Sequence, residues 1–103
     1  MSQAATGEPV HYRLRLFIAG TAPRSRRTVE TVRRFCEVHL AARHELEIVD
    51  IFQQPGLAER DGIIAAPTLL KLAPGPERRI TGSFDEDRLL HGLDLPQALE
   101  THL

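Results

Sequence analysis

The chain has 103 residues, of which 42% are hydrophobic, and this composition suits one hydrophobic core rather than two. A formal net charge of −1 gives no reason to expect binding to nucleic acid or to an anionic membrane. No stretch of about 18 apolar residues occurs, so we expect no membrane-spanning helix. Because Cys36 is the only cysteine, an internal disulfide bond is impossible and a reducing compartment, the cytoplasm, is expected.

The chain is expected to divide into a flexible N-terminal leader over residues 1–10, one folded domain over residues 11–96 and a C-terminal tail over residues 97–103. The leader is small and polar and lacks the apolar core of a signal peptide. Charge is unevenly spread, because residues 1–44 carry eight Arg against three Glu, whereas residues 45–103 carry five basic against eleven acidic residues. This polarity suits self-association or orientation against a charged partner, although ordinary solvated faces would give the same pattern.

The first half of the domain predicts a strand, a long helix and a second strand. Residues 12–19 begin with strict alternation of apolar and charged side chains, which is typical of a strand. Pro23 suits the first turn of a helix, with Thr21 or Ser25 as its cap. An apolar stripe with helical spacing follows, made of Val29, Val32, Phe35, Cys36 and Leu40. Apolar residues over 45–52 predict the second strand, which should lie parallel to the first.

The second half predicts a short helix, a hairpin and a last helix. Residues 53–56 form a turn, residues 57–61 one or two helical turns, and residues 68–72 and 78–81 two strands joined by the turn Pro74-Gly75-Pro76. Ser83 and Glu86 have the spacing of a capping box at the start of the last helix, which Gly92 ends. The order is βαβαββα, a single α/β domain with the arrangement of the thioredoxin fold.

Proteins of this fold usually carry a Cys-x-x-Cys pair at the start of the first long helix, where the helix dipole lowers a thiol pKa. Residues 21–25 occupy that place here and contain no cysteine, so dithiol chemistry has no nucleophile. Cys36 lies on the apolar stripe and is expected to behave as a small core residue. Cys36 and His39 lie one turn apart, but two ligands are fewer than the four of a structural zinc site, so we expect no metal and no cofactor.

Six short stretches resemble the KaiB family of circadian clock proteins in their order and spacing. They span residues 16–23, 48–51, 54–59, 63–69, 78–82 and 92–95, so the resemblance covers residues 12–95. It implies a non-enzymatic cytoplasmic clock protein that binds the KaiC ATPase ring and modulates its phosphorylation cycle. It also implies competition with a sensor histidine kinase and sequestration of KaiA, although a KaiA partner cannot be assumed because the acidic tail of cyanobacterial members is missing.

The resemblance further implies a protein with two folds. One is the thioredoxin-like βαβαββα monomer that binds KaiC, and the other is a ground-state βαββααβ fold that assembles as a homotetramer or dimer. Four residues occupy positions that influence the balance between the folds: Pro67, Gly92 and Asp94, which match the family pattern, and Gly62, which replaces the usual lysine. Three residues are candidates for contact with KaiC, namely Arg27, Arg78 and Arg79. The sequence does not reveal the peptide isomer at Pro67.

Two other functions remain as alternatives. The first is a thioredoxin-like protein that handles thiols or glutathione through Cys36. The second is a detached sensor domain of a clock histidine kinase, which has a similar thioredoxin-like fold.

Overall fold

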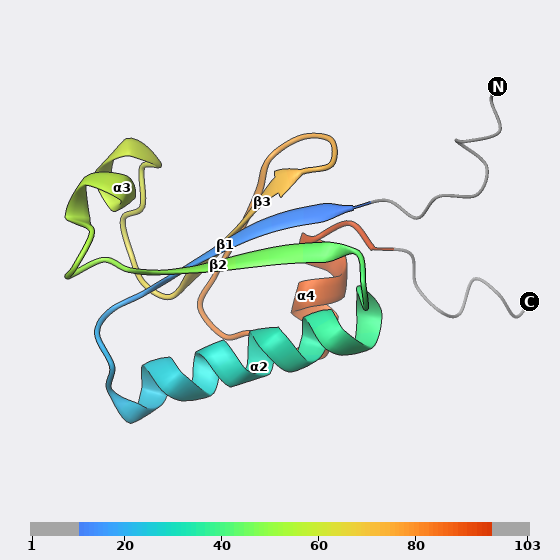
Figure 1. Cartoon of the computed structure of the whole chain (residues 1–103), viewed down its shortest axis with the longest axis horizontal. Helices are drawn as coiled ribbons and strands as arrows, with labels where there is room; N and C mark the ends of the chain where they lie inside the picture. The colour runs from blue at the N-terminus through green and yellow to red at the C-terminus, as the bar shows by residue number, and fades with distance from the viewer. Residues whose placement is uncertain (1–10, 96–103) are drawn as a thin grey trace, which may run out of the picture.

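The structure, a computed structural model, describes residues 11–95; the expected leader, the expected tail and Pro96 lie outside the described residues. The elements follow the order expected from the sequence (Figure 1). They are β1 (Tyr12–Ile18), α2 (Pro23–His39), β2 (His44–Asp50), α3 (Pro55–Arg60), β3 (Thr68–Ala73), β4 (Arg78–Thr81) and α4 (Glu86–Gly92). Within residues 11–95, none of the helices combines the length and the apolar character needed to cross a bilayer.

The four strands form one mixed sheet in the order β2-β1-β3-β4. Strand β1 pairs in parallel with β2, in a register that runs from Tyr12 opposite His44 to Ile18 opposite Asp50. Strand β3 is antiparallel to both β1 and β4, so the expected parallel pair and the expected hairpin are confirmed. The second strand ends at Asp50 instead of residue 52, because the Asp50 side chain accepts a hydrogen bond from the Phe52 backbone N–H (2.9 Å) and starts a turn.

Helices α2 and α4 lie on one side of the sheet and α3 lies on the other (Figure 1). The larger core fills the side of α2 and α4. Its fully buried members include Leu16, Val32, Cys36, Leu40 and Leu69. The smaller core lies under α3 and consists of Phe17, Val49, Ala58 and Leu70, with partly buried neighbours. Strand β1 contributes to both cores, so its end is apolar on both faces, as its sequence predicts.

Both expected helix caps are wrong. The residue before α2 is Ala22, which offers no side-chain cap, and the Ser25 hydroxyl instead donates to the Ala19 carbonyl (3.2 Å). Helix α4 is capped by Asp85, whose carboxylate accepts from the Arg88 N–H (2.9 Å). Glu86 is therefore the first residue of the helix and is free to reach α2. Capping depends on where the chain enters the helix, and packing against the sheet sets that point.

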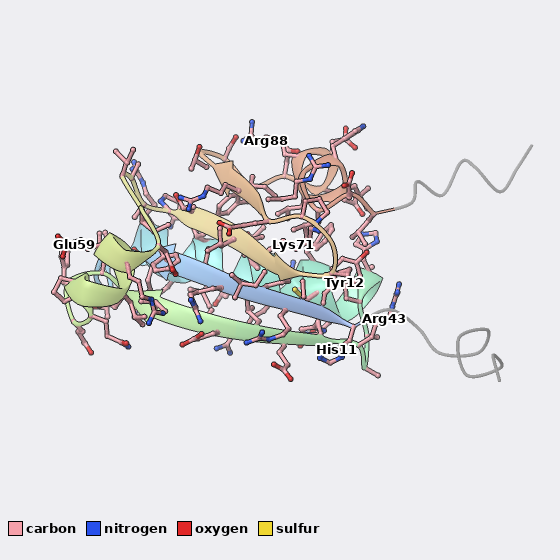
Figure 2. The ribbon with its side chains drawn as sticks, turned by 90° about the horizontal axis from the view of Figure 1, so that it is seen from above. His11, Tyr12, Arg43, Glu59, Lys71 and Arg88 are labelled. Atoms are coloured by element: carbon pink, nitrogen blue, oxygen red, sulfur yellow. The ribbon has the colours of Figure 1, made fainter. Side chains whose placement is uncertain are left out.

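Lys71 is a buried cation in the middle of β3, with 2% of its surface exposed (Figure 2). Its ammonium donates hydrogen bonds to the carbonyls of Pro74 and Pro76, at 3.0 Å for Pro76. Burial lowers the Lys71 pKa, although the negative charge of Asp94 opposes that effect. The only lysine of the chain therefore serves to hold the β3–β4 turn, because the two carbonyls replace the water that burial removes.

Gly92, the last residue of α4, lies directly against β4. A Cβ atom placed on it would lie 2.4 Å from Cδ1 and 2.5 Å from Cγ1 of Ile80. The left-handed residue after the helix is Asp94, with φ of 63°, rather than Gly92. Gly92 is thus required for close packing between α4 and β4, and not for a positive φ at the helix end.

We predict that Gly92→Ala destabilises the domain by about 1–3 kcal/mol, because the added methyl group forces α4 away from Ile80. Urea denaturation measures this change. Gly56→Ala is the matched control: it also lies in a helix, has no atom within 4 Å of its added Cβ, and should be neutral or stabilising by up to about 1 kcal/mol. Equal effects of the two substitutions would show that the contact does not constrain the packing.

Candidate partner-binding surface

Two large apolar side chains are exposed at the end of the sheet where β1 and β2 finish and β3 begins. Phe52 is 71% exposed and Ile64 is 98% exposed. Between the start of α2 and the start of β3 lies a hollow of about 300 Å³, lined by Ala19, Ala22, Arg24, Ser25, Thr28, Ala66 and Pro67. We call Phe52, Ile64 and this hollow the sheet-end surface. Exposed apolar groups at the same end of the sheet as a hollow are typical of a site for another molecule.

Hydrogen bonds hold the loops that build the sheet-end surface. The Asp50 carboxylate accepts from the backbone N–H groups of Gly20 (3.0 Å) and Phe52 (2.9 Å), so it joins the chain after β1 to the chain after β2. Gly20 has a φ of +79°, and the Phe52 ring lies over it. The Thr68 hydroxyl donates to the Ala65 carbonyl (2.7 Å) just before β3. The surface is therefore anchored by β1, β2 and β3 together.

The start of α2 makes this end of the molecule electropositive. The first turn contains no acidic residue, and the exposed side chains of Arg24, Arg26 and Arg27 follow Pro23. The dipole of a 17-residue helix places partial positive charge at the same end. Since the apolar side chains lie at the same end of the sheet as this positive charge, the surface suits an apolar segment with acidic neighbours.

Three of the four residues expected to influence the fold contact β4. Asp94 accepts a hydrogen bond from Arg78 (2.8 Å), and the Gly62 carbonyl accepts one from Arg79 (3.1 Å). Gly92 lies against Ile80, as described above. Arg78 and Arg79 were expected to contact the partner. In the structure they instead form hydrogen bonds with Asp94 and Gly62, two of the residues expected to affect the fold.

The remaining two predicted residues lie near the start of α2. Pro67 lines the hollow of the sheet-end surface, and the peptide bond between Ala66 and Pro67 is cis. The side chain of Arg27 is exposed on α2 and, among residues 11–95, makes no hydrogen bond or ion pair. Of the three arginines singled out from the sequence, Arg27 is thus the one whose guanidinium is available to a partner.

Phe52 and Ile64 were missed from the sequence. Each is the second residue of an apolar doublet, Ile51-Phe52 or Ile63-Ile64. The first residue of each doublet packs against the smaller core, and the second points away from it. An apolar doublet at the end of a strand or loop could have indicated an exposed apolar side chain, because only one of two adjacent side chains can face the core there.

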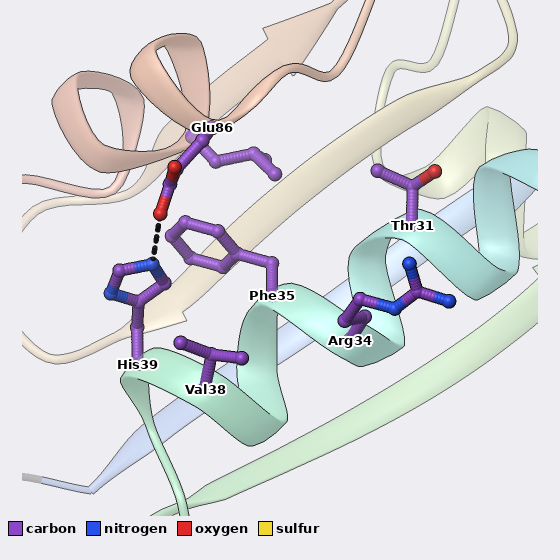
Figure 3. A pocket seen from close by; sticks show the side chains of 7 residues that line it. Thr31, Arg34, Phe35, Val38, His39 and Glu86 are labelled. Atoms are coloured by element: carbon purple, nitrogen blue, oxygen red, sulfur yellow. Dashed lines mark hydrogen bonds and ion pairs between the residues drawn. The ribbon is translucent and has the colours of Figure 1, made fainter.

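A second hollow lies between α2 and α4 and has a volume of about 260 Å³ (Figure 3). His39 Nε2 and Glu86 Oε2 lie 2.7 Å apart across it, and the His39 ring contacts Phe35 at a tilt of 35°, with centroids 4.4 Å apart. His39 is therefore engaged with α4, whereas Cys36 is buried in the larger core. Within residues 11–95, no three residues of the metal-binding types come together.

The Cys36 thiol is poorly suited to chemistry. Its side chain is fully buried in the larger core. Burial, with a smaller contribution from the charge of Glu37, raises the pKa of Cys36 to about 11. The thiol is therefore protonated at neutral pH and out of reach of a substrate, which counts against the thiol-handling alternative.

Comparison with known proteins gives one family. The family model for the KaiB domain matches residues 15–95. A circadian clock oscillator protein KaiB from Synechococcus sp. (strain RCC307) is 45% identical over 85 residues, which are 82% of this chain and 77% of that protein.

Solved structures share the fold. The N-terminal domain of Synechococcus elongatus SasA has a TM-score of 0.70 at 26% identity, over 84% of this chain and 83% of that one. Chloroplastic thioredoxin z has a TM-score of 0.68 at 15% identity, over 87% of this chain and 80% of that one. The expected thioredoxin-like fold is therefore confirmed.

We predict that Cys36 in the folded protein reacts with iodoacetamide at neutral pH at least about a hundredfold more slowly than in urea, because the raised pKa alone lowers the thiolate fraction by that factor. Mass spectrometry measures the alkylation. Similar rates in both states would restore the thiol-handling alternative.

Because the folded-state pKa is raised from 9.0 to about 11, the contribution of Cys36 to stability is complete below pH 9.0 and is lost as the pH rises through about 11.

Proposed function

The chain belongs to the KaiB family, and on this premise we propose that it is a non-enzymatic circadian clock protein that binds the KaiC ATPase ring and modulates its phosphorylation cycle. The observation that carries the proposal is the sheet-end surface, where Phe52 and Ile64 are exposed next to the basic start of α2. This arrangement suits recognition of another protein. Cytoplasmic localisation is part of the same proposal.

The surface supports binding over catalysis. Its hollow is lined by Ala, Pro, Ser, Thr and Arg side chains, and the Ser25 hydroxyl is directed to the Ala19 carbonyl. The buried Cys36 thiol cannot reach this hollow as a nucleophile. The match of the KaiB family model to residues 15–95 also favours this function over a detached sensor domain of a clock histidine kinase.

The proposed partner segment has a definite chemistry. An apolar side chain of the partner would cover Phe52 and Ile64, and acidic residues beside it would face Arg24 and Arg27. KaiA or a sensor histidine kinase is a further proposed partner, and a homotetramer or dimer is the proposed resting assembly.

We predict that Ile64→Glu weakens binding to KaiC by at least about tenfold, because a charge replaces the most exposed apolar side chain of the sheet-end surface. Size exclusion after long incubation of the protein with KaiC and ATP measures the complex, and titration gives the affinity. Val38→Glu is the matched control, since Val38 is 67% exposed near the other end of α2 and should bind as wild type. The proposal would be refuted if the wild type failed to co-elute with KaiC.

The proposal includes a second backbone arrangement of residues 57–95. Support comes from β4, an edge strand of four residues that contacts Gly62, Gly92 and Asp94. Changes at these residues would loosen β4 without touching the pairing of β1 and β2. Two arrangements within a few kcal/mol of each other are the general requirement for such a switch.

We predict that Asp94→Arg shifts the populations of the two arrangements. The substitution replaces the pair with Arg78 by two adjacent cations and puts a long side chain at φ 63°. NMR secondary shifts over residues 57–95 should report a second set of signals. Asp94→Asn is the control, because Asn tolerates the left-handed conformation and carries no repelling charge. Only local shift changes in Asp94→Arg would count against a switch in this chain.

A further inference from the structure

Helix α3 is held to the sheet by little apolar contact. It has six residues, and only Ala58 is buried among them. Leu57 and Ile63 add partly buried contacts with the smaller core. A helix of this length is unstable by itself in water, so its position depends on tertiary contacts other than this small core.

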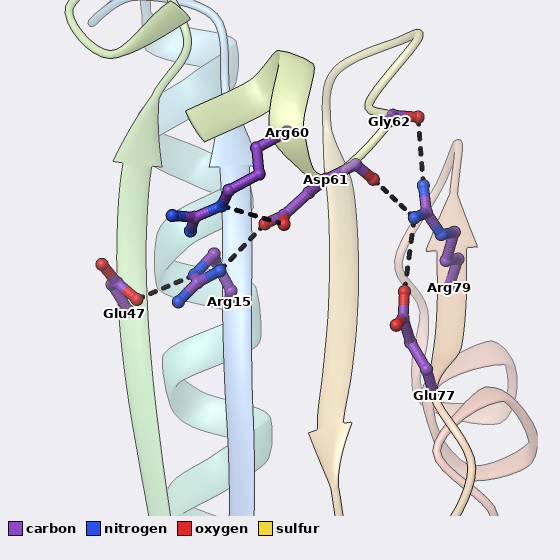
Figure 4. A network of polar contacts seen from close by, with 7 residues as sticks. All are labelled: Arg15, Glu47, Arg60, Asp61, Gly62, Glu77 and Arg79. Carbon is purple, nitrogen blue, oxygen red and sulfur yellow. Dashed lines mark hydrogen bonds and ion pairs between the residues drawn. The ribbon is translucent and has the colours of Figure 1, made fainter. Parts of the chain in front are cut away.

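Arg15, in the central strand, provides one such contact (Figure 4). Its Nη1 atom lies 2.9 Å from Asp61 Oδ2, and its Nε atom lies 2.8 Å from Glu47 Oε1. The side chains of Arg15 and Asp61 are only 15% and 16% exposed. Because solvent screens this pair weakly, it has more effect than an ordinary surface ion pair.

Arg79, in β4, holds the same residue through its main chain. Its Nη2 atom donates to the Asp61 carbonyl (2.5 Å) and its Nη1 atom donates to the Gly62 carbonyl (3.1 Å) (Figure 4). These carbonyls follow the end of α3 and have no partner within the helix. Two arginines from β1 and β4 thus hold the side chain and the main chain of Asp61.

The contacts at Asp61 fix one end of the loop that presents Ile64. The other end is fixed by the hydrogen bond from Thr68 to the Ala65 carbonyl (2.7 Å). Ile64 lies between these two anchors and is 98% exposed. An exposed apolar side chain on a loop held at both ends is preorganised for binding, which lowers the entropy lost when a partner binds.

We infer that Arg15, Asp61 and Arg79 are positioning residues for partner binding, because they set the place of the Ile64 loop in the sheet-end surface. This inference rests on the proposed function and deepens it. Arg79 was expected to contact the partner, and here it acts through the loop. Arg15 and Asp61 were not singled out from the sequence, because the contact joins residues 46 positions apart.

Asp61→Asn tests the inference in the free protein and in the complex. We expect the backbone amides of Gly62 and Ile63, which donate to the carbonyls of Glu59 and Ala58, to exchange with solvent about tenfold faster. Amides of β1 that pair with β2 should keep their rates. Affinity for KaiC in the presence of ATP should fall about tenfold. Glu77→Gln is the control: among residues 11–95 the Glu77 carboxylate pairs only with Arg79 (3.3 Å), and its side chain is 49% exposed, so both readouts should match wild type.

Conservative substitution separates positioning from general stability. Arg15→Lys keeps a positive charge near Asp61, whereas Arg15→Met removes it. When the two variants are folded to the same extent, Arg15→Lys should retain part of the affinity for KaiC that Arg15→Met loses. If the wild type binds KaiC and Asp61→Asn binds it equally well, the inference is overturned while the proposed function stands. Unchanged amide exchange in Asp61→Asn would have the same consequence. Absence of wild-type binding would instead remove the proposed function, whatever the exchange rates.

Discussion

The rest of the structure depends on the central strand β1, which is paired on both edges and packed on both faces. It pairs in parallel with β2 and antiparallel with β3, so each half of the chain is joined to the other through it. Leu14 and Leu16 fill the core under α2 and α4, whereas Phe17 fills the core under α3. Arg15, between these residues, extends the same strand into the polar contacts that hold α3. One strand thus sets the position of both helical layers.

The second half of the chain is attached in a different way. Strand β4 has only four residues and lies at the edge of the sheet, where it pairs with β3 and buries Ile80 in the larger core. It is held further by Lys71 at its turn, by Gly92 of α4 and by side-chain contacts of its two arginines, and these contacts are polar or dependent on one close approach. Arg79 of this edge strand holds the carbonyls of Asp61 and Gly62, so the place of the loop before β3 depends in part on β4, and low local stability is common in segments that rearrange or bind.

Local chemistry explains which elements were predictable. Alternation over residues 12–19, the apolar stripe of α2 and the proline-rich turn before β4 each act within a few residues, so the order βαβαββα and the parallel first pair followed from them. The caps were not predictable in the same way. Asp85 and not Ser83 caps α4, because packing against β4 decides where that helix begins. The start of α3 at Pro55, two residues before the expected 57, places a proline in the first turn of the helix, where its missing N–H costs no helical hydrogen bond.

The sequence by itself determined the element order, the place of Cys36 in the core, the lack of a thiol pair at the start of α2 and the resemblance to the KaiB family, since each of these lies in short-range spacing and residue identity. Only the tertiary structure decided that Phe52 and Ile64 share one end of the sheet, that Arg78 meets Asp94, and that Arg15 and Arg79 meet at Asp61. The physical reason is that strand pairing brings together residues far apart in the chain, and no periodicity within a segment records which of them will face each other.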